Sequence, residues 1–73
     1  MAKKGDNAVY RVTEVIGTSS QSWEDAARNA VKTAAGTLRD LRIAEIEKLD
    51  VKIENGKITQ FRARLSLSFK YGA

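Results

Sequence analysis

Carboxylates and cations are the side chains of this chain that could do chemistry, because its 73 residues include no histidine and no cysteine. Their absence excludes imidazole acid–base catalysis, thiol nucleophiles, disulfides, and thiolate or imidazole metal ligands. Nor is there a glycine-rich phosphate loop, since Gly17–Ser20 has the composition of an ordinary turn that leads into a helix. The composition therefore predicts a binding protein and not an enzyme.

The carboxylates that could bind a cation concentrate in one segment, with a further one upstream: Glu45, Glu47, Asp50 and Glu54, and Glu14. No EF-hand spacing occurs among them, so they do not form a standard metal site within one subunit. In a symmetric oligomer, however, an axis repeats each carboxylate, so several subunits can complete a site that one subunit lacks. The alternative is that these are solvated charges interleaved with Lys48 and Lys52. The spacing alone leaves both interpretations open.

Positive charge dominates the chain, with a net charge of +4 and an isoelectric point near 9.7. Such a balance favours anionic partners. Arg62, Arg64 and Lys70 alternate along one segment, so a basic nucleic-acid-binding module is an alternative function. That segment places Phe61 and Phe69 on its other face, which leaves no aromatic platform for bases beside the basic residues. Nucleic acid is therefore not the partner that we expect.

An amphipathic helix is the clearest element of the chain, and we expect it over residues 22–40. Ser22 is a suitable N-cap, and the apolar positions recur in steps of three and four: Trp23, Ala26, Ala27, Ala30, Val31, Ala34, Ala35, Leu38 and Leu41. Most of this stripe is alanine, so another backbone can approach it closely. Gly36 indicates either such an approach or early fraying of the helix.

Three strands are expected around this helix, over residues 8–16, 42–54 and 57–70. The apolar positions of the second strand change from even to odd numbers, which requires a bulge, and we place it near Glu47 and Lys48. Asn55-Gly56 predicts a type I′ hairpin, and the third strand alternates regularly. The sequence therefore predicts an α+β subunit of order βαββ, whose three-stranded antiparallel sheet packs on one helix.

A single subunit of this kind would leave one sheet face and a strand edge uncovered. Chains this short bury too little surface to be comfortably stable alone, and exposed edges are normally paired or covered, so we expect a homo-oligomer. No apolar run is long enough to span a bilayer and no signal segment opens the chain, so we expect a cytoplasmic location and no membrane partner. Residues 1–7 are expected to form a flexible tail before a single domain over 8–73.

Several short motifs occur in a characteristic order: Val9-Tyr10-Arg11-Val12-Thr13-Glu14-Val15-Ile16-Gly17-Thr18-Ser19, Thr37-Leu38-Arg39-Asp40-Leu41-Arg42, Asn55-Gly56-Lys57-Ile58 and Ser68-Phe69-Lys70. Together they resemble the dodecins, a family of small bacterial flavoproteins, over nearly the whole chain. The resemblance implies a βαββ subunit that assembles into a hollow homododecamer, with the helices outside and the sheets lining the inside.

Typical dodecins hold pairs of flavins between symmetry-related tryptophans, and this chain departs from the family at three flavin contacts. On the resemblance, Ile43 replaces the stacking tryptophan, Arg62 replaces a glutamine that hydrogen-bonds the ring, and Asp50 replaces an arginine that meets the phosphate in some members. An aliphatic side chain offers no planar face, and an arginine cannot accept a hydrogen bond. We therefore expect no flavin, with a flavin-storing dodecin of atypical pocket as the alternative. Trp23 is interpreted as a core or interface anchor and not as a substitute platform.

One branch of the family has an aliphatic residue in place of the tryptophan and an aspartate at the position of Asp50, and is described as calcium-binding. The resemblance to this branch implies a non-enzymatic cage that binds or stores a cation or a small ligand. We rank the candidate metal ligands in this order: Asp50, Glu45, Glu47 and Glu14. Some dodecins also bind coenzyme A, so an anionic nucleotide at the surface is a further candidate, with Arg11 and Lys70 as its phosphate contacts.

Overall fold

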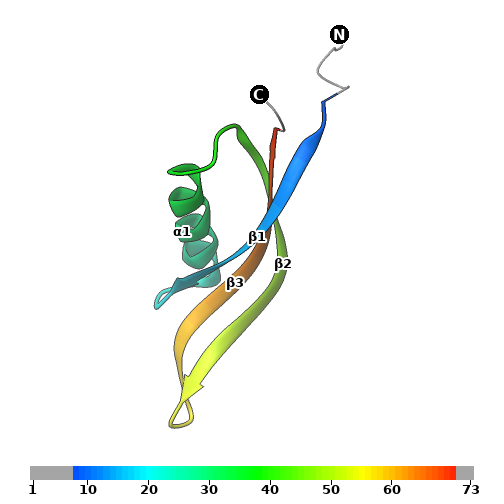
Figure 1. Ribbon diagram of the computed structural model, residues 1–73. Helices are drawn as coiled ribbons and strands as arrows, with labels where there is room; N and C mark the ends of the chain where they lie inside the picture. The colour runs from blue at the N-terminus through cyan, green and yellow to red at the C-terminus, as the bar shows by residue number, and fades with distance from the viewer. Residues whose placement is uncertain (1–7, 71–73) are drawn as a thin grey trace.

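The computed structural model describes residues 8–70, which form one helix and three strands (Figure 1). In chain order these are β1 (Tyr10–Ser19), α1 (Trp23–Ala35), β2 (Leu41–Glu54) and β3 (Lys57–Lys70). The strand order in the sheet is β1-β3-β2, and both neighbouring pairs are antiparallel. The predicted βαββ class, with a three-stranded antiparallel sheet and one helix, is confirmed.

The helix lies against one face of the sheet, mainly over β1 and β3 (Figure 1). Its alanine stripe packs on the central strand, and the buried apolar residues come from these two elements: Ala26, Ala30, Ala34, Ala63, Leu65 and Leu67. β1 approaches the helix so closely that a Cβ atom on Gly17 would lie 2.0 Å from the carbonyl oxygen of Ala26. The close backbone approach predicted from the alanine stripe therefore occurs, and β1 makes it.

The helix ends earlier than the sequence predicted, at Ala35 and not at residue 40. Gly36 is its C-cap, and the chain leaves through a turn in which the Leu38 amide donates to the Ala34 carbonyl oxygen at 2.8 Å. Leu38 and Leu41 still pack against the core from this turn and from the start of β2. The apolar stripe thus continues past the helix, which is why its periodicity overstated the length of the helix.

The first strand begins at Tyr10 and ends at Ser19, both later than the predicted bounds of 8 and 16. It ends later because residues 17–19 continue the ladder with β3 instead of turning. Gly17 is small because α1 packs directly on it, and the glycine and hydroxyl residues of this segment were mistaken for those of a turn. The turn follows Ser19, and Ser22 then caps α1 as predicted. Its hydroxyl oxygen accepts a hydrogen bond from the Asp25 amide at 3.0 Å.

The predicted bulge in β2 is confirmed, since the pairing with β3 shifts between Ile46 and Lys48 and leaves Glu47 as the extra residue. A second shift, between Lys52 and Ile53, was not predicted. A third lies near the start of β2. These irregularities decide which side chains of β2 point toward α1 and which point away from it.

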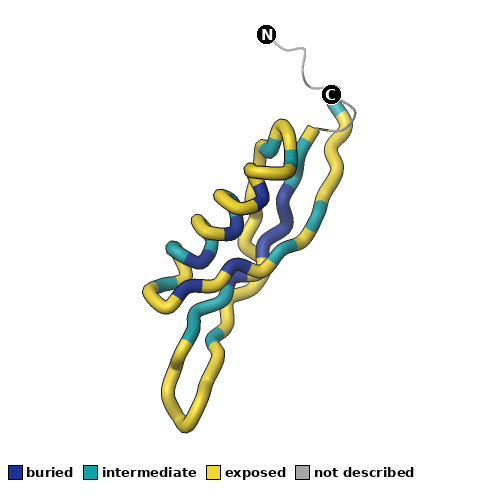
Figure 2. The backbone as a smooth tube through the Cα atoms, turned by 60° about the vertical axis from the view of Figure 1, so that its left-hand side comes forward, coloured by how far each residue is buried: buried dark blue, intermediate teal, exposed yellow. Residues whose placement is uncertain are grey.

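The β2–β3 hairpin extends beyond the N-terminal start of α1 and is exposed at its tip (Figures 1 and 2). Asn55 and Gly56 at the tip have φ angles of 53° and 76°. Positive values at both central residues are those of a type I′ turn, so the predicted hairpin is also confirmed. The described chain is correspondingly elongated, with extents of 53 × 20 × 16 Å.

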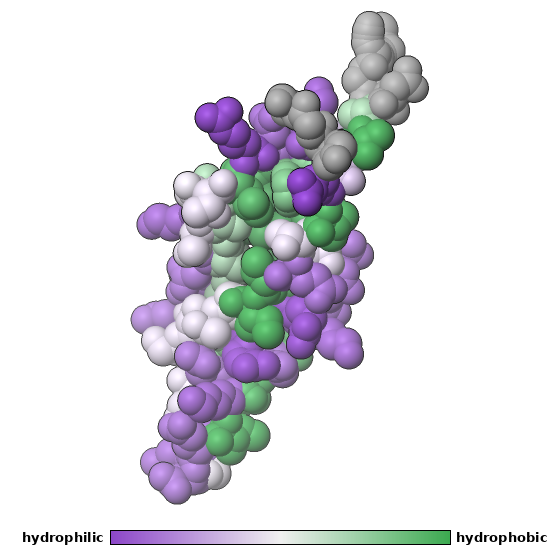
Figure 3. All heavy atoms as spheres, viewed as in Figure 1, coloured by the Kyte–Doolittle hydropathy of each residue, from purple (hydrophilic) through white to green (hydrophobic). Residues whose placement is uncertain are grey.

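Many large apolar side chains reach the surface of the single subunit (Figure 3). They are Val9, Tyr10, Val12, Ile16, Trp23, Ile43, Ile46, Leu49, Ile53 and Ile58. Those of β2 on the helix side are open because α1 covers mainly β1 and β3. An exposed set of this size is typical of an interaction surface. Within residues 8–70, no helix has the length and apolar character needed to cross a membrane, and the expected tail over residues 1–7 lies outside the described part of the chain.

Candidate ion-binding face of the sheet

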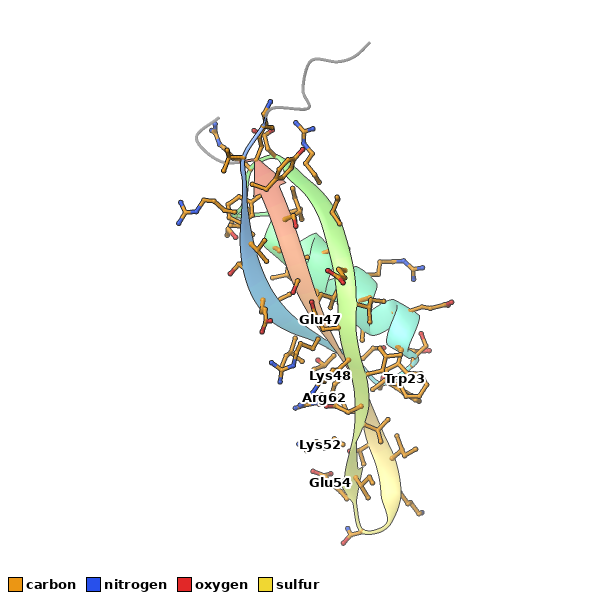
Figure 4. The ribbon with its side chains drawn as sticks, turned by 90° about the vertical axis from the view of Figure 1, so that its right-hand side faces the viewer. Trp23, Glu47, Lys48, Lys52, Glu54 and Arg62 are labelled. Atoms are coloured by element: carbon orange, nitrogen blue, oxygen red, sulfur yellow. The ribbon has the colours of Figure 1, made fainter. Side chains whose placement is uncertain are left out.

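The sheet face that points away from α1 carries most of the charged side chains of the strands, and we call it the charged face. Its members follow from the alternation of β3. Leu65 and Leu67 are buried against the helix, so Ser66 between them points to the opposite face. In Figure 4, Arg62 lies on this side of the sheet, whereas Trp23 lies on the side of the helix.

Three glutamates gather around Ser66 on the charged face, and we call Glu14, Glu45 and Glu47 the acidic row. The ladder places Glu14 of β1 and Glu45 of β2 opposite Ser66, one on each side. The bulge adds Glu47, whose carboxylate accepts a hydrogen bond from the Ser66 hydroxyl at 2.8 Å. Ser66 is only 9% exposed, although no helix covers this face. Three of the four candidate metal ligands are therefore neighbours in the fold.

One subunit does not complete a metal site with these residues. In the part of the chain that the structure describes, no three acidic side chains converge closely enough to hold a metal ion. Glu14 also lies 3.6 Å from the Arg64 guanidinium, and Glu47 is engaged by Ser66. Because calcium needs about six to eight oxygens, further ligands would have to come from water or from other subunits.

Asp50, the candidate ranked first, lies away from the acidic row and pairs with Arg62 in the ladder. The Arg62 Nε donates to one carboxylate oxygen at 2.7 Å, and a terminal nitrogen of the same guanidinium donates to the other at 3.4 Å. This hydrogen bonding to Arg62 lowers the pKa of Asp50 and raises the pKa of Arg62. Two of the three positions that the sequence analysis compared with flavin contacts thus neutralise each other, which that analysis did not predict.

Trp23 links the start of α1 to the same part of β2. Its indole N–H donates to the backbone carbonyl oxygen of Asp50 at 3.0 Å. Its ring meets the ring of Phe61 edge-on, with centroids 5.3 Å apart and planes at 77°. Trp23 remains 39% exposed, so it packs within the subunit and still presents part of its ring to the outside. No sequence signal pointed to the hydrogen bond with Asp50, because it joins residues 27 positions apart.

Ile43 lies on the charged face, in the row beyond the acidic row. It pairs with Ser68, and Val12 of β1 pairs with the same serine from the other side. The Ile43 and Val12 side chains are 60% and 62% exposed. This aliphatic row offers no ring against which a planar ligand could stack.

Lys48 and Arg64 occupy the row between the acidic row and the Asp50–Arg62 pair, directly opposite each other in the ladder. The sequence analysis treated Lys48 and Lys52 as charges interleaved with the acids. The Lys52 ammonium lies 3.4 Å from the Glu54 carboxylate. The bulge brings Lys48 opposite a second cation instead.

The two candidate phosphate contacts near the other end of the sheet do not share a face. Arg11 pairs with Phe69, and Lys70 pairs with Tyr10, in successive rows of the β1–β3 ladder. Side chains in successive rows point to opposite faces of a sheet. The ladder of one subunit therefore does not direct both residues toward one ligand.

Comparisons with known proteins agree with one another. A family model described as Dodecin matches residues 9–72. The calcium dodecin of Mycobacterium tuberculosis is 44% identical over 64 residues, which cover 86% of this chain and 89% of that protein. A solved structure of dodecin from Streptomyces coelicolor aligns with a TM-score of 0.86 and 40% identity, over 93% of this chain and 97% of that one.

A second solved structure is that of the calcium dodecin from Mycobacterium tuberculosis, described as a calcium-chelating immunodominant antigen with a novel calcium-binding site. It aligns with a TM-score of 0.78 and 42% identity, over 86% of this chain and 90% of that one. The sequence and structure comparisons thus both include a calcium-binding relative.

Proposed function

This chain belongs to the dodecin family, and from that premise we propose that it forms a non-enzymatic homododecameric cage that binds calcium on the charged faces of its sheets. The observation that carries the proposal is the acidic row, in which three glutamates gather around one serine. The relative named calcium dodecin supports the choice of cation. The lack of imidazole and thiol groups supports a binding role over catalysis.

The apolar surface of the subunit supports its assembly. Leu65 and Leu67 are its only large side chains in residues 8–70 that are fully buried, whereas ten large apolar residues are exposed. Covering apolar surface contributes about 25 cal/mol per Å², so subunits gain stability by packing these residues together. We expect light scattering under native conditions to give twelve times the subunit mass. A monomer or a dimer would contradict the proposed cage.

Glu14, Glu45 and Glu47 are the ligands that the geometry supports best. Two acidic rows that meet across a symmetry axis would bring six carboxylates to one ion, which meets the demand of calcium for about six to eight oxygens. Asp50 is the ligand that the resemblance favours. Its carboxylate must first release the two hydrogen bonds from Arg62, and this competition lowers its affinity for a cation.

Flavin is not a ligand in this proposal. Ile43 has no ring for stacking, and the Asp50–Arg62 ion pair occupies two further positions at which the family contacts the flavin. Aromatic pairs contribute about 0.5–1.5 kcal/mol beyond burial, so the loss of two stacking faces, about 1–3 kcal/mol, lowers the affinity for flavin by roughly fivefold to a hundredfold.

Thermal unfolding of the purified protein tests both ligands in one experiment. The four conditions are EDTA, millimolar calcium with EDTA omitted, millimolar magnesium, and FMN. A ligand that binds only the native assembly stabilises it by about 2.7 kcal/mol at a concentration one hundred times its Kd. We expect calcium to raise the melting temperature above that in EDTA. Magnesium should raise it less, because magnesium demands a tighter octahedral site.

Each outcome of this experiment has a distinct meaning. A rise with calcium and none with FMN supports the proposal. A rise with FMN alone, with quenched flavin fluorescence, would replace the proposal by the alternative of a flavin-storing dodecin. No rise with either ligand would remove the calcium proposal and leave the family membership unaffected.

A further inference from the structure

The directly opposed cations Lys48 and Arg64 are an energetic anomaly of the charged face. Residues opposite each other in an antiparallel pair have Cβ atoms about 5 Å apart, and like charges in this arrangement destabilise the sheet. The bulge at Glu47 creates the arrangement, because it sets the pairing of Lys48 with Arg64. A negative charge placed between the two side chains would turn this repulsion into attraction.

The neighbouring cations of the charged face already have carboxylate partners. Arg62 is held by Asp50 through a contact of 2.7 Å, and Lys52 lies 3.4 Å from Glu54. These charges are therefore neutralised within the subunit, and they do not compete for an external anion.

Lys48 and Arg64 differ from these neighbours. Among residues 8–70, the Lys48 ammonium forms no ion pair or hydrogen bond, and its side chain is exposed. Arg64 reaches only Glu14, at 3.6 Å, which is longer than a hydrogen bond. Glu14 is thus the one carboxylate in residues 8–70 that pairs with either cation, although the charge of Arg64 also acts on Asp50, which Arg62 already holds. Lys48 has no carboxylate partner of its own in this part of the chain.

We propose that Lys48 and Arg64 form a binding site for an oxyanion of the phosphate class. The arginine fork can donate two parallel hydrogen bonds to such an anion, and the lysine supplies a mobile point charge from the opposite strand. Ile16 pairs with Arg64 from the β1 side and is 44% exposed, so it borders the site with an apolar side chain. A free phosphate ion and the phosphate group of a nucleotide share the required chemistry.

The anion site and the acidic row share Glu14, which couples them. Glu14 lies 3.6 Å from the Arg64 guanidinium, and it is also a proposed calcium ligand. Calcium that recruits Glu14 therefore frees Arg64 for the anion, and by linkage the anion favours calcium to the same extent. This coupling depends on the proposed calcium function, whereas the anion site itself does not.

Isothermal titration calorimetry at low ionic strength tests the site with three probes: inorganic phosphate, adenosine monophosphate and sulfate. Calorimetry is preferable to melting curves, because phosphate and sulfate stabilise most proteins without binding to them. We expect Lys48→Gln to weaken phosphate binding about tenfold, as the loss of one charged contact does. Lys32→Gln, an exposed substitution on α1 with the same change in charge, should leave the affinity unchanged.

Arg64→Lys provides a second variant that keeps the charge and removes only the fork. A clear weakening by this variant supports a built site, whereas unchanged binding would mean attraction by charge alone and would overturn the proposal. An absence of phosphate binding would also overturn the proposal, and so would an equal loss of phosphate affinity in Lys48→Gln and Lys32→Gln. Tighter binding of adenosine monophosphate than of phosphate identifies a nucleotide as the source of the anion, and equal binding identifies the free ion.

Sulfate serves for the measurement of coupling, because it stays soluble with millimolar calcium. Tighter sulfate binding in calcium than in EDTA supports the shared role of Glu14. Anion binding that depends on Lys48 but ignores calcium would sustain the anion site and count against the proposed calcium ligands. Calcium binding without any anion binding would sustain the proposed function and overturn the anion site.

Discussion

The acidic row and the Asp50–Arg62 pair lie on one face of the same sheet, yet their carboxylates are neutralised in different ways. At the pair, one carboxylate receives two hydrogen bonds from a single guanidinium, at 2.7 and 3.4 Å. At the row, Glu47 accepts one hydrogen bond from the Ser66 hydroxyl, and Glu14 lies 3.6 Å from the Arg64 guanidinium. The subunit satisfies its own charge in the first region and leaves it largely unsatisfied in the second.

This difference indicates which carboxylates gain favourable free energy when they bind a cation. A carboxylate that arginine already holds must exchange one favourable partner for another, so its net gain on binding calcium is small. A carboxylate without a full complement of donors keeps a negative charge that a divalent cation can neutralise without displacing another partner. The family resemblance favours Asp50 as the principal calcium ligand, whereas the balance of charge favours the acidic row.

The largest expected effect comes from removing charge in the acidic row. The double substitution Glu14→Gln and Glu47→Gln should abolish the calcium-induced rise in melting temperature, because it removes two of three carboxylates per subunit. Asp50→Asn should keep most of that rise. Differential scanning calorimetry in calcium and in EDTA measures both, and Glu24→Gln on the first turn of α1 is the control for charge. The opposite result, with the rise lost only in Asp50→Asn, would make Asp50 the principal ligand.

The second effect concerns stability without a ligand. Trp23→Phe should lower the free energy of unfolding by about 1 kcal/mol, because the Asp50 carbonyl oxygen loses its indole donor. Urea unfolding followed by circular dichroism measures the change. The calcium-induced rise should be unaffected, since Trp23 lies on the helix side of the sheet. A lost calcium response in this variant would show that the two regions are not independent.

A smaller effect is expected from Arg62→Gln, which frees Asp50 and removes one cation from the charged face. The affinity for calcium should rise about twofold, as expected for the loss of one screened repulsion several ångströms away. Arg28→Gln makes the same change in charge on the exposed side of α1 and should leave the affinity unaltered. A decrease in affinity would mean that Arg62 supports the site.

The smallest effect is the pH dependence of the ion pair. Because the pKa of Asp50 in the folded protein is below its ordinary value of 3.8, the pair stabilises the fold above that value. This contribution is lost as the pH falls through the lower, folded pKa. The difference in melting temperature between wild type and Asp50→Asn should therefore be present at neutral pH and shrink in acid. A difference that grows in acid would contradict this assignment.

The sequence predicted those parts of the fold that depend on local signals. The Asn55-Gly56 turn, the alternation of β3 and the change of phase at Glu47 are read within a few residues, and all three are confirmed. The predicted end of α1 was wrong because Leu38 reaches the core from a turn as readily as it would from a helix. Apolar periodicity indicates which residues face the core, but it does not show whether those residues belong to a helix or to a turn.

The ion pair of the candidate site could not be predicted, because it depends on register. Counted back from the hairpin turn without interruption, Asp50 would lie opposite Phe61. The irregularity between Lys52 and Ile53 moves it opposite Arg62. Thr59 is the extra residue there, and its hydroxyl donates to the Lys52 carbonyl oxygen at 3.3 Å. No residue type in this stretch signals a bulge, so the partner of Asp50 emerged only from the three-dimensional structure.

The bulge in β2 also has a consequence for insertions and deletions. Without Glu47, Ile46 would be followed directly by Lys48, and the ladder partners Leu65 and Arg64 would be consecutive as well. A deletion of Glu47 would therefore leave every other side chain of β2 on its present face, whereas a deletion elsewhere in a regular strand turns the rest of that strand over. Glu47 is thus a residue that a strand can gain or lose in one step. A dodecin could acquire or discard the carboxylate that Ser66 holds without rebuilding its sheet.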